Sequence, residues 1–306
     1  MPNKRDFLSV DDLSPAELVG LLDEADEIKA RPEAFAERIA GRQVLLIFEK
    51  PSTRTRVSFE VAVTSMGGHA LVLRSDELQL GRGETIGDTG RVLSGYADAI
   101  VLRTFGQDRL ELLAEAAAVP VVNALSDFSH PCQALADLQS IREQKGTLEG
   151  LALAYLGDGN NVAHSLMFAG AKVGMDVRVA SPPGYEPSAQ VAERSSLIGA
   201  ETGGRTTVTN VVAEAASGAD VLYTDVWASM GQESQSGERA EILAHYRLDG
   251  DAVDLAKEDV IVMHCLPAHR DEEIAAEVLD GPHSVVWDQA ANRLHTQKAL
   301  LAWLLG

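Results

Sequence analysis

Short apolar runs alternate with helix-like segments along almost the whole chain, and this alternation constrains the fold more than any other feature. Apolar runs at Val44 to Phe48, Asp98 to Leu102 and Val119 to Leu125 are each followed by a segment with helical spacing of apolar residues. The same order starts again at Leu151 to Leu156. Such alternation is typical of parallel strands with helices on both faces, so we expect an α/β fold with two doubly wound parallel sheets.

The length of 306 residues suits two domains, and the polar segment from Lys145 to Gly150 separates the two alternating halves. We therefore expect a first domain over residues 1–146 and a second over residues 147–306. Near the end of the chain, the pattern predicts a last strand from Ser284 to Trp287 and a helix from Asn292 to Leu305.

A segment rich in hydroxyls and arginines, Ser52-Thr53-Arg54-Thr55-Arg56, joins the first apolar run to a helix. Ser52 stands where an N-cap belongs, and the N-terminus of a helix attracts anions through its N–H groups and its partial positive charge. In the alternative interpretation, Ser52 only caps the helix and the arginines are solvated. The segment by itself leaves both interpretations open.

Polar residues also follow other predicted strands, at the sheet edge where open α/β folds bind ligands. In the first half these residues are Arg103, His130 and Gln133. Together with residues 52–55 they form a group that can hold a phosphate and polarise a carbonyl. In the second half the corresponding residues are Asn161, Asp225 and Ser229. A polar, carboxylate-bearing set of this kind suits an amino acid, so the residues point to transfer of a group from an acyl phosphate to an amine.

The composition excludes several partners. A formal net charge of -20 argues against binding to nucleic acid or to an anionic membrane, both of which attract basic surfaces. No apolar run approaches the roughly 20 residues that span a bilayer. The two cysteines, Cys132 and Cys265, do not form a disulfide framework, so we expect a soluble protein in the reducing cytoplasm. Lysine is scarce, and an origin in a salt-adapted organism is a hypothesis.

A nucleotide or a metal is disfavoured by the details of the motifs. The glycine-bearing turn Gly157 to Val162 follows a strand, but its last position is not glycine, and the next strand ends at Ala180 without a carboxylate for a ribose. His264, Cys265 and His269, with His130 and Cys132, are soft ligand types, yet their spacing matches no closed zinc site. We expect neither a cofactor nor a metal.

Four segments resemble the characteristic motifs of the aspartate/ornithine transcarbamoylase superfamily. They are Ser52-Thr53-Arg54-Thr55-Arg56, His130-Pro131-Cys132-Gln133, Asp225-Val226-Trp227-Ala228-Ser229-Met230-Gly231 and His264-Cys265-Leu266-Pro267. The first two are common to the superfamily, while the last two resemble the motifs of its ornithine-specific members. The resemblance implies transfer of the carbamoyl group of carbamoyl phosphate to the side-chain amine of ornithine, in a cleft between two domains.

The resemblance also implies roles for individual residues. Carbamoyl phosphate would contact Ser52, Thr53, Arg54, Thr55, Gln79, Arg103, His130, Gln133, Cys265, Leu266 and Arg293, and ornithine would contact Asn161, Asp225, Ser229 and Met230. Arg103, His130 and Cys265 would act in catalysis. Arg293 lies in the last helix, about residues 290–306, which would pack back onto the first domain.

Gln79 belongs to a polar segment that is either a connector or a lid. By resemblance it reaches the phosphate in a neighbouring subunit, which implies a homotrimer, or a multiple of trimers, with intersubunit active sites. Two other classes stay open: a catalytically silent relative and, more weakly, a nicotinamide oxidoreductase. Whether the reaction serves synthesis or degradation of arginine is left open as well.

Overall fold

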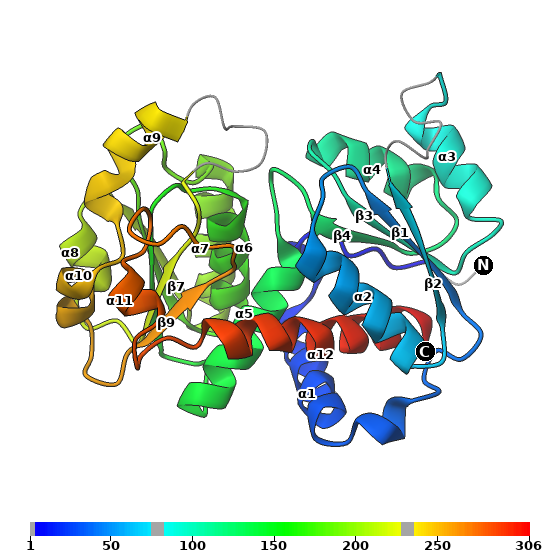
Figure 1. The fold of residues 1–306 in the computed structure, drawn as a ribbon, viewed down its shortest axis with the longest axis horizontal. Helices are drawn as coiled ribbons and strands as arrows, with labels where there is room; N and C mark the ends of the chain where they lie inside the picture. The colour runs from blue at the N-terminus through cyan, green and yellow to red at the C-terminus, as the bar shows by residue number, and fades with distance from the viewer. Residues whose placement is uncertain (1–3, 75–82, 228–235) are drawn as a thin grey trace. The chain divides into compact units, whose positions relative to one another are not determined.

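The computed structural model describes residues 4–74, 83–227 and 236–306. Its contacts divide the chain into two compact units. The first unit comprises Met1–Ala136 and Asn292–Gly306, and the second comprises Asp137–Ala291. Both transitions fall inside helices, α5 (Pro131–Lys145) and α12 (Val286–Leu305) (Figure 1).

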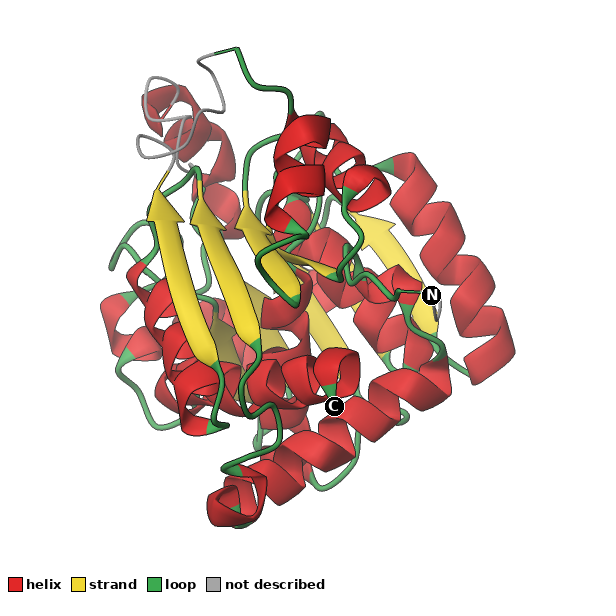
Figure 2. Cartoon of the chain, turned by 90° about the vertical axis from the view of Figure 1, so that its right-hand side faces the viewer, coloured by secondary structure: helices red, strands yellow, loops and turns green. Residues whose placement is uncertain are grey.

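The first unit is built on a four-stranded parallel sheet in the order β2-β1-β3-β4, whose strands point the same way in Figure 2. Its strands are β1 (Gln43–Phe48), β2 (His69–Arg74), β3 (Ala99–Arg103) and β4 (Val121–Leu125). Its helices, besides α5 and α12, are α1 (Pro15–Ala30), α2 (Thr53–Ser65), α3 (Ile86–Leu93) and α4 (Gln107–Ala116), with 3-10 turns η1 (Val10–Asp12) and η2 (Pro32–Phe35).

Local sequence explains where these helices begin. Ser14 caps α1 in a capping box with Glu17, and Pro15 occupies the first helical position. Leu18, Leu21 and other apolar residues of α1 are buried along one face. In the sheet, β1 and β3 are almost wholly buried, as expected for central strands of a parallel sheet.

The second unit has a five-stranded parallel sheet in the order β7-β6-β5-β8-β9. Its strands are β5 (Ala152–Leu156), β6 (Asp176–Ala180), β7 (Arg205–Thr209), β8 (Val221–Thr224) and β9 (Ile261–His264). Its helices are α6 (Asn161–Lys172), α7 (Ala189–Thr202), α8 (Val212–Ala216), α9 (Ser236–Leu243), α10 (Gly250–Leu255) and α11 (Ala276–Leu279), with the 3-10 turn η5 (Ala244–Tyr246). The predicted fold class, two doubly wound parallel sheets, is confirmed.

The strand predicted from Ser284 to Trp287 is wrong. Ser284 forms only an isolated bridge with Val262, and the helix α12 already begins at Val286. A short apolar run does not distinguish a buried strand from the first turn of a buried helix. Here the tertiary structure decides, because the residues continue into a helix of 20 residues. Among the described residues, no helix combines the length and the hydropathy needed to cross a bilayer.

Candidate active site

The segment after β1 begins the first unit's cluster of site residues. Ser52 is the N-cap of α2, because its Oγ accepts a hydrogen bond of 3.2 Å from the Thr55 N–H, and the predicted cap is thereby confirmed. The other N–H groups of a first helical turn have no acceptor within the helix, so they remain suited to an anion. Ser52 and Arg54 are half-buried, while Thr53 is exposed.

The carboxyl ends of β1, β3 and β4 meet at the same edge of the first sheet. The Glu49 N–H donates to the Arg103 carbonyl at 2.9 Å, and the Thr104 N–H donates to the Leu125 carbonyl at 3.0 Å. The Glu49 carboxylate also accepts hydrogen bonds from the Thr104 hydroxyl and from Arg109. Glu49 was not among the predicted site residues, although its position directly after a buried strand indicates that it lies at the ligand-binding edge of the sheet.

Arg293 of α12 connects two predicted site residues of the first unit. Its guanidinium donates to Gln133 Oε1 at 2.8 Å and to Thr55 Oγ1 at 3.4 Å. Arg293 is only 3% exposed, and Gln133 and Thr55 are each 1% exposed. A buried guanidinium with these partners fixes both side chains and contributes a positive charge to the cluster.

His130 is buried, directly precedes α5, and is subject to the charges of three arginines. Burial lowers the pKa of His130 well below the ordinary 6.5, and the positive charges of Arg293, Arg103 and Arg54 lower the pKa further. The imidazole is therefore neutral at physiological pH, and in that state one ring nitrogen carries a proton to donate. The chain has a large negative net charge, yet this cluster is locally positive. It is the kind of environment that an anionic substrate requires.

We expect the free energy of unfolding to fall as the pH is lowered from about 7.5 to about 5.5. Unfolded His130 takes up a proton below about pH 6.5, whereas the folded chain keeps the ring neutral because its pKa is lowered. The unfolded state then binds more protons, and one such histidine contributes up to about 1.4 kcal/mol per pH unit. Urea denaturation at the two pH values measures the decline, which should be smaller in His130→Gln.

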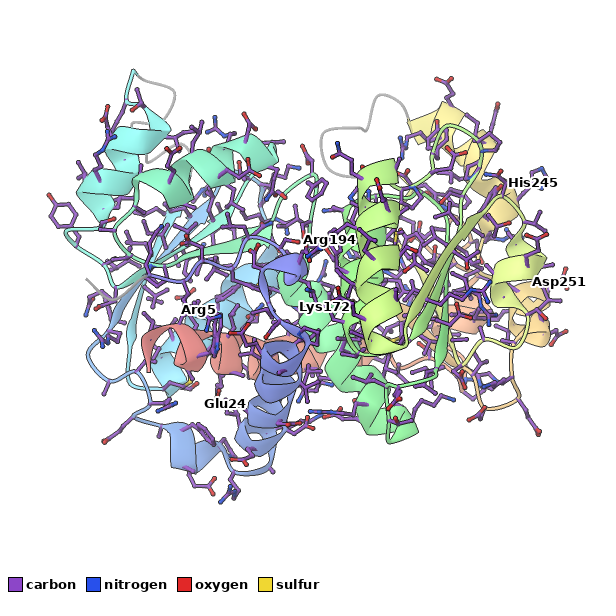
Figure 3. All side chains as sticks on the ribbon, turned by 180° about the vertical axis from the view of Figure 1, so that it is seen from behind. Arg5, Glu24, Lys172, Arg194, His245 and Asp251 are labelled. Atoms are coloured by element: carbon purple, nitrogen blue, oxygen red, sulfur yellow. The ribbon has the colours of Figure 1, made fainter. Side chains whose placement is uncertain are left out.

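The matched control for this experiment is His245→Gln. His245 is exposed at the surface of the second unit (Figure 3). Its replacement should leave the decline as in the native chain, since an exposed ring has nearly the same surroundings before and after unfolding. Equal declines in the native chain and in His130→Gln would contradict the neutral, buried imidazole.

Cys132 is a structural thiol. Its side chain is buried, its Sγ donates to the Asn123 carbonyl at 3.4 Å, and burial raises its pKa to about 12. Because thiolates are the nucleophilic and metal-binding form of cysteine, Cys132 is unsuited to either role.

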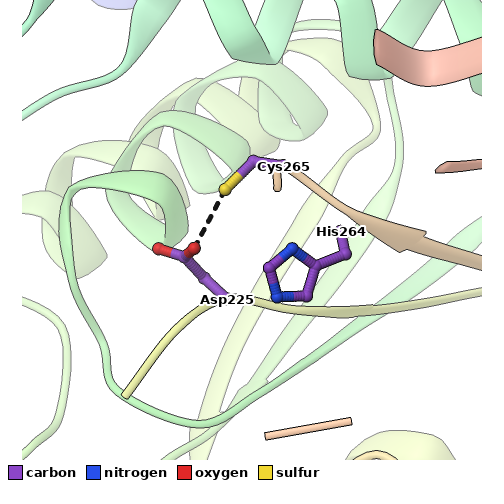
Figure 4. Close-up of side chains that lie close together, drawn as sticks. All are labelled: Asp225, His264 and Cys265. Carbon is purple, nitrogen blue, oxygen red and sulfur yellow. Dashed lines mark hydrogen bonds between the residues drawn. The ribbon is translucent and has the colours of Figure 1, made fainter. Parts of the chain in front are cut away.

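In the second unit, Asp225 and Cys265 form a pair at the ends of β8 and β9 (Figure 4). The Cys265 thiol donates to Asp225 Oδ1 at 2.9 Å. The other carboxylate oxygen accepts from Asn160 Nδ2 at 2.8 Å. Asp225 is 6% exposed, and Cys265 is half-buried. The structure thus brings together a carboxylate and a thiol that are 40 residues apart in sequence.

Asn160 was not among the predicted site residues, whereas its neighbour Asn161 was. Asn160 is the N-cap of α6, and its Oδ1 accepts from the N–H groups of Val162 and Ala163. Asn161 is the first residue of α6 and is buried. An asparagine directly before a helix that follows a buried strand is the indication that points to Asn160.

His264 lies close to the Asp225 and Cys265 pair, so the three side chains together offer nitrogen, oxygen and sulfur ligands. Both ring nitrogens of His264 are engaged, however. Nδ1 accepts from the Leu266 N–H at 2.8 Å, and Nε2 lies 3.2 Å from Glu273 Oε1. An imidazole needs a free lone pair to bind a metal, so this arrangement does not favour a metal site.

Buried polar side chains also support the end of β9. Gln289 Oε1 accepts from the His264 N–H at 3.0 Å, while Gln289 Nε2 donates to Asp137 Oδ1 at 2.7 Å. The Tyr223 hydroxyl joins the same network through Asp137 Oδ2 at 3.3 Å. These residues carry no recognisable motif in the sequence, because their relation depends on the folded chain.

The glycine-bearing turn before α6 packs against the protein's own chain. A Cβ on Gly159 would lie 2.2 Å from the Pro187 nitrogen, which leaves no room for a side chain. Gly157 has a φ of +133°, a conformation that favours glycine. At Gly159 the close approach is to residues 186 and 187, and this packing accounts for that glycine without a bound pyrophosphate.

Three predicted site residues, Gln79, Ser229 and Met230, lie outside the described residues. Leu266, in the second unit, follows Cys265 and is half-buried. The described site residues thus form two groups, one around His130 and Arg293 in the first unit and one around Asp225 and Cys265 in the second.

The fold and the two groups define a class: an α/β protein with two parallel-sheet units, one with a cationic cluster and the other with a carboxylate and thiol pair. Residues 5–143 match the family model of the carbamoyl-P binding domain of aspartate/ornithine carbamoyltransferase. The corresponding Asp/Orn binding domain matches residues 149–304. The chain belongs to the aspartate/ornithine carbamoyltransferase family.

Individual relatives agree with this assignment. An ornithine carbamoyltransferase of Parafrankia is 63% identical over 304 residues, which cover 98% of this chain and 96% of that protein. The solved ornithine carbamoyltransferase of Pyrococcus furiosus has a TM-score of 0.96 and 52% identity, covering 99% of this chain and 97% of that one. A solved N-acetyl-L-ornithine transcarbamylase also matches, with a TM-score of 0.88 and 31% identity over 98% and 99% of the two chains. The fold therefore does not by itself select the amine.

Proposed function

We propose that this chain is an ornithine carbamoyltransferase, which transfers the carbamoyl group of carbamoyl phosphate to the side-chain amine of L-ornithine. The products are L-citrulline and phosphate, and the reaction is reversible. Curated relatives with this name are 63%, 58% and 53% identical to the chain over nearly its whole length, and they support the choice of ornithine. The observation that carries the proposal is a buried cationic cluster, in which Arg293 binds Gln133 and Thr55, and burial and the charges of three arginines keep His130 neutral.

The first unit would bind carbamoyl phosphate. We assign its phosphate to the helix N-terminus and to the side chains of Ser52, Thr53, Arg54, Thr55 and Arg103, because hydroxyls, guanidiniums and N–H groups together suit a phosphate. The neutral ring of His130 would donate to the carbonyl oxygen, together with Thr55 and Arg103. Each donor aimed at the oxygen where charge develops is worth about a hundred- to a thousandfold in rate.

The carbamoyl nitrogen needs acceptors. We assign them to the side-chain oxygen of Gln133 and to the main-chain carbonyls of Cys265 and Leu266. Gln133 Oε1 already accepts from Arg293, but an amide oxygen has two lone pairs and can accept a second hydrogen bond. Arg293 would hold Gln133 in position and lie beside the substrate.

The second unit would bind ornithine through Asn161, Asp225, Ser229 and Met230. We assign the α-ammonium of ornithine to Asp225, whose buried carboxylate retains acceptor capacity beyond its bonds to Cys265 and Asn160. The side-chain ammonium must lose one proton to become a nucleophilic amine. The Cys265 thiol would position that amine and assist its deprotonation.

The reaction balances without a further reactant. The amine nitrogen forms a bond to the carbamoyl carbon, the bond from that carbon to the phosphate oxygen breaks, and the bonding pair leaves with phosphate. As this bond forms, the amine nitrogen loses a further proton, which is accepted by the departing phosphate. The residues serve to orient, to polarise and to stabilise charge, and the proposed chemistry requires no cofactor and no metal.

We also propose that the protein works in the cytoplasm as a homotrimer or a multiple of trimers, with Gln79 of one subunit contacting the phosphate in the next. The phosphate-binding residues proposed above precede residue 146 and the proposed ornithine-binding residues follow it. We therefore propose a domain division near residue 146, with carbamoyl phosphate assigned to the first part and ornithine to the second. Light scattering on the purified protein should give a mass that is a multiple of three times 32.7 kDa.

The activity is tested by measuring citrulline formed from carbamoyl phosphate and ornithine, with putrescine, N-acetylornithine and aspartate as competing acceptors. We expect ornithine to be the preferred acceptor, since Asp225 offers an anion to its α-ammonium. Because the chain is highly acidic, the assay is run from low to high salt. Binding of carbamoyl phosphate without any product at all salt concentrations would instead identify a catalytically silent relative.

A further inference from the structure

Glu273 is a fully buried carboxylate in the segment between β9 and α11, and it lies outside the group of predicted site residues. It is 0% exposed. Its Oε1 accepts from the ring Nε2–H of His264 at 3.2 Å and from the His269 N–H at 2.5 Å. Burial raises the pKa of Glu273, but the opposing effects, foremost the hydrogen bonds from His264 and His269, leave the pKa below its ordinary value. The group is therefore a buried anion at neutral pH.

The hydrogen bonds of His264 determine its tautomer. Nδ1 accepts from the Leu266 N–H at 2.8 Å, so it carries no proton. The proton of the neutral ring is then on Nε2, where it is donated to Glu273. Glu273 favours this tautomer over the alternative, because a carboxylate accepts a hydrogen bond and cannot accept one from an unprotonated nitrogen.

The ring in turn orients the main chain of the predicted site. The peptide bond between Cys265 and Leu266 is planar and trans, so its carbonyl oxygen points away from its N–H. When the Leu266 N–H is bound to the ring, the Cys265 carbonyl is directed to the opposite side. Leu266 has a φ of +59°, a conformation uncommon for a residue with a side chain, and the ring hydrogen bond helps to hold it.

A second contact holds His264 itself. Gln289 Oε1 accepts from the His264 N–H at 3.0 Å and fixes the backbone at the end of β9. This contact does not depend on the ring tautomer. The ring Nε2–H donates to Glu273, and the ring Nδ1 accepts from the Leu266 N–H. Glu273 and the Leu266 N–H therefore lie at the two ends of one chain of hydrogen bonds that depends on the tautomer.

We infer that Glu273 is a positioning residue for carbamoyl transfer, which acts through the His264 ring to direct the main-chain carbonyl of Cys265. The inference rests on the proposed function, in which that carbonyl holds the carbamoyl nitrogen. A buried carboxylate is costly, and Glu273 Oε2 accepts no hydrogen bond from the described residues, although His269 Nδ1 lies 3.5 Å from it. Control of the histidine tautomer requires an acceptor opposite Nε2, which Glu273 supplies and an apolar residue would not.

The experiment compares Glu273→Leu and Glu273→Gln with the native enzyme. Leucine removes the acceptor, so the ring can rotate or change tautomer, and kcat should fall about a hundredfold, as expected for a misplacement of about 1 Å. Glutamine keeps a carbonyl oxygen for the Nε2–H and should retain activity to within about fivefold, because a neutral acceptor is weaker than a charged one. The matched control is Glu272→Leu at the exposed neighbouring position, which should leave kcat unchanged.

Two further measurements separate positioning from stability. Nitrogen-15 NMR of labelled histidine should show His264 with its proton on Nε2 in the native protein and in Glu273→Gln, but as a mixture in Glu273→Leu. In the His264→Asn background, where the side-chain amide can still accept from the Leu266 N–H, either Glu273 variant should cost no further activity.

Native kcat and an unchanged tautomer in Glu273→Leu, with only a lower melting temperature, would overturn the inference. If that variant does not fold, the loss of activity caused by Glu273→Gln is compared between the native and the His264→Asn backgrounds. A decrease in kcat caused by Glu273→Gln that is the same in both backgrounds would then refute a role through the ring. The tautomer measurement requires no turnover. A native protein that makes no citrulline therefore counts against the proposed function, while the link between Glu273 and His264 is still tested.

Discussion

Replacing Arg293 with glutamine should lower kcat/KM for carbamoyl phosphate by about a thousandfold. The change removes the guanidinium bonds to Gln133 and Thr55, and charge-assisted bonds of this kind are worth about 1.5 to 3 kcal/mol each. Both partners are then left buried and incompletely paired. Steady-state kinetics with carbamoyl phosphate as the varied substrate measures the loss.

The same variant has a second expected effect. Arg293 is the first of the three arginines whose charge lowers the pKa of His130, so its removal should raise that pKa towards the ordinary value. The decline in unfolding free energy between about pH 7.5 and about pH 5.5 should then be smaller than in the native chain.

Arg31→Gln is the matched control for Arg293→Gln. Arg31 is exposed at the C-terminal end of α1 and forms an ion pair of 3.4 Å with Glu27. An exposed pair contributes little, so this variant should keep native kinetics and nearly native stability. If Arg293→Gln retained kcat/KM to within threefold, the assignment of Arg293 to the carbamoyl phosphate site would be wrong.

Replacing Asp225 with asparagine should raise KM for ornithine by at least about a hundredfold. The variant loses the charge assigned to the α-ammonium of ornithine, and charged hydrogen bonds in a buried site are worth about 1.5 to 3 kcal/mol. It also disturbs the local network, because Cys265 and Asn160 donate to different oxygens of Asp225, and the amide NH2 that replaces one of these oxygens cannot accept a hydrogen bond. Affinity for carbamoyl phosphate, measured by calorimetry, should change much less.

Two companion variants make this test specific. Asp251→Asn removes a carboxylate that is exposed on α10 of the same unit (Figure 3), and it should have native KM values. Cys265→Ser keeps a donor for Asp225 but changes the thiol, and it should weaken ornithine binding and lower turnover. Unchanged kinetics in Cys265→Ser would rule out a role for the thiol, and an unchanged ornithine KM in Asp225→Asn would refute the assignment of the α-ammonium.

Much of the secondary structure follows from local patterns. The strands β1 (Gln43–Phe48) and β5 (Ala152–Leu156) end where the apolar runs predict and begin within one residue of the predicted starts. Ser52 was recognisable as a cap because hydroxyl residues before a helical pattern satisfy its first N–H groups. The error at Ser284 to Trp287 arose where a short apolar run was compatible with two structures and its tertiary surroundings selected the helix.

The site was only partly predictable. Residues at strand ends, such as Arg103 and Asp225, stand out because parallel strands bring their carboxyl ends to one edge. Arg293 was identified by resemblance, and its contact with Thr55 spans 238 residues of sequence. Asn160, Gln289 and Glu273 were missed. Their significance lies in hydrogen bonds to site residues, and no spacing in the chain reports such bonds.

The sequence by itself determined the two parallel sheets, the capped helix after the first strand and the family, because apolar periodicity and compact motifs are local properties of the chain. Only the tertiary structure decided that burial and the charges of three arginines keep His130 neutral, that the Cys265 thiol donates to Asp225, and that Glu273 lies within hydrogen-bonding distance of the His264 ring. These relations depend on burial and on contacts between distant segments. Both arise only when the chain has folded, since that is when water is excluded and the distant groups come within hydrogen-bonding distance.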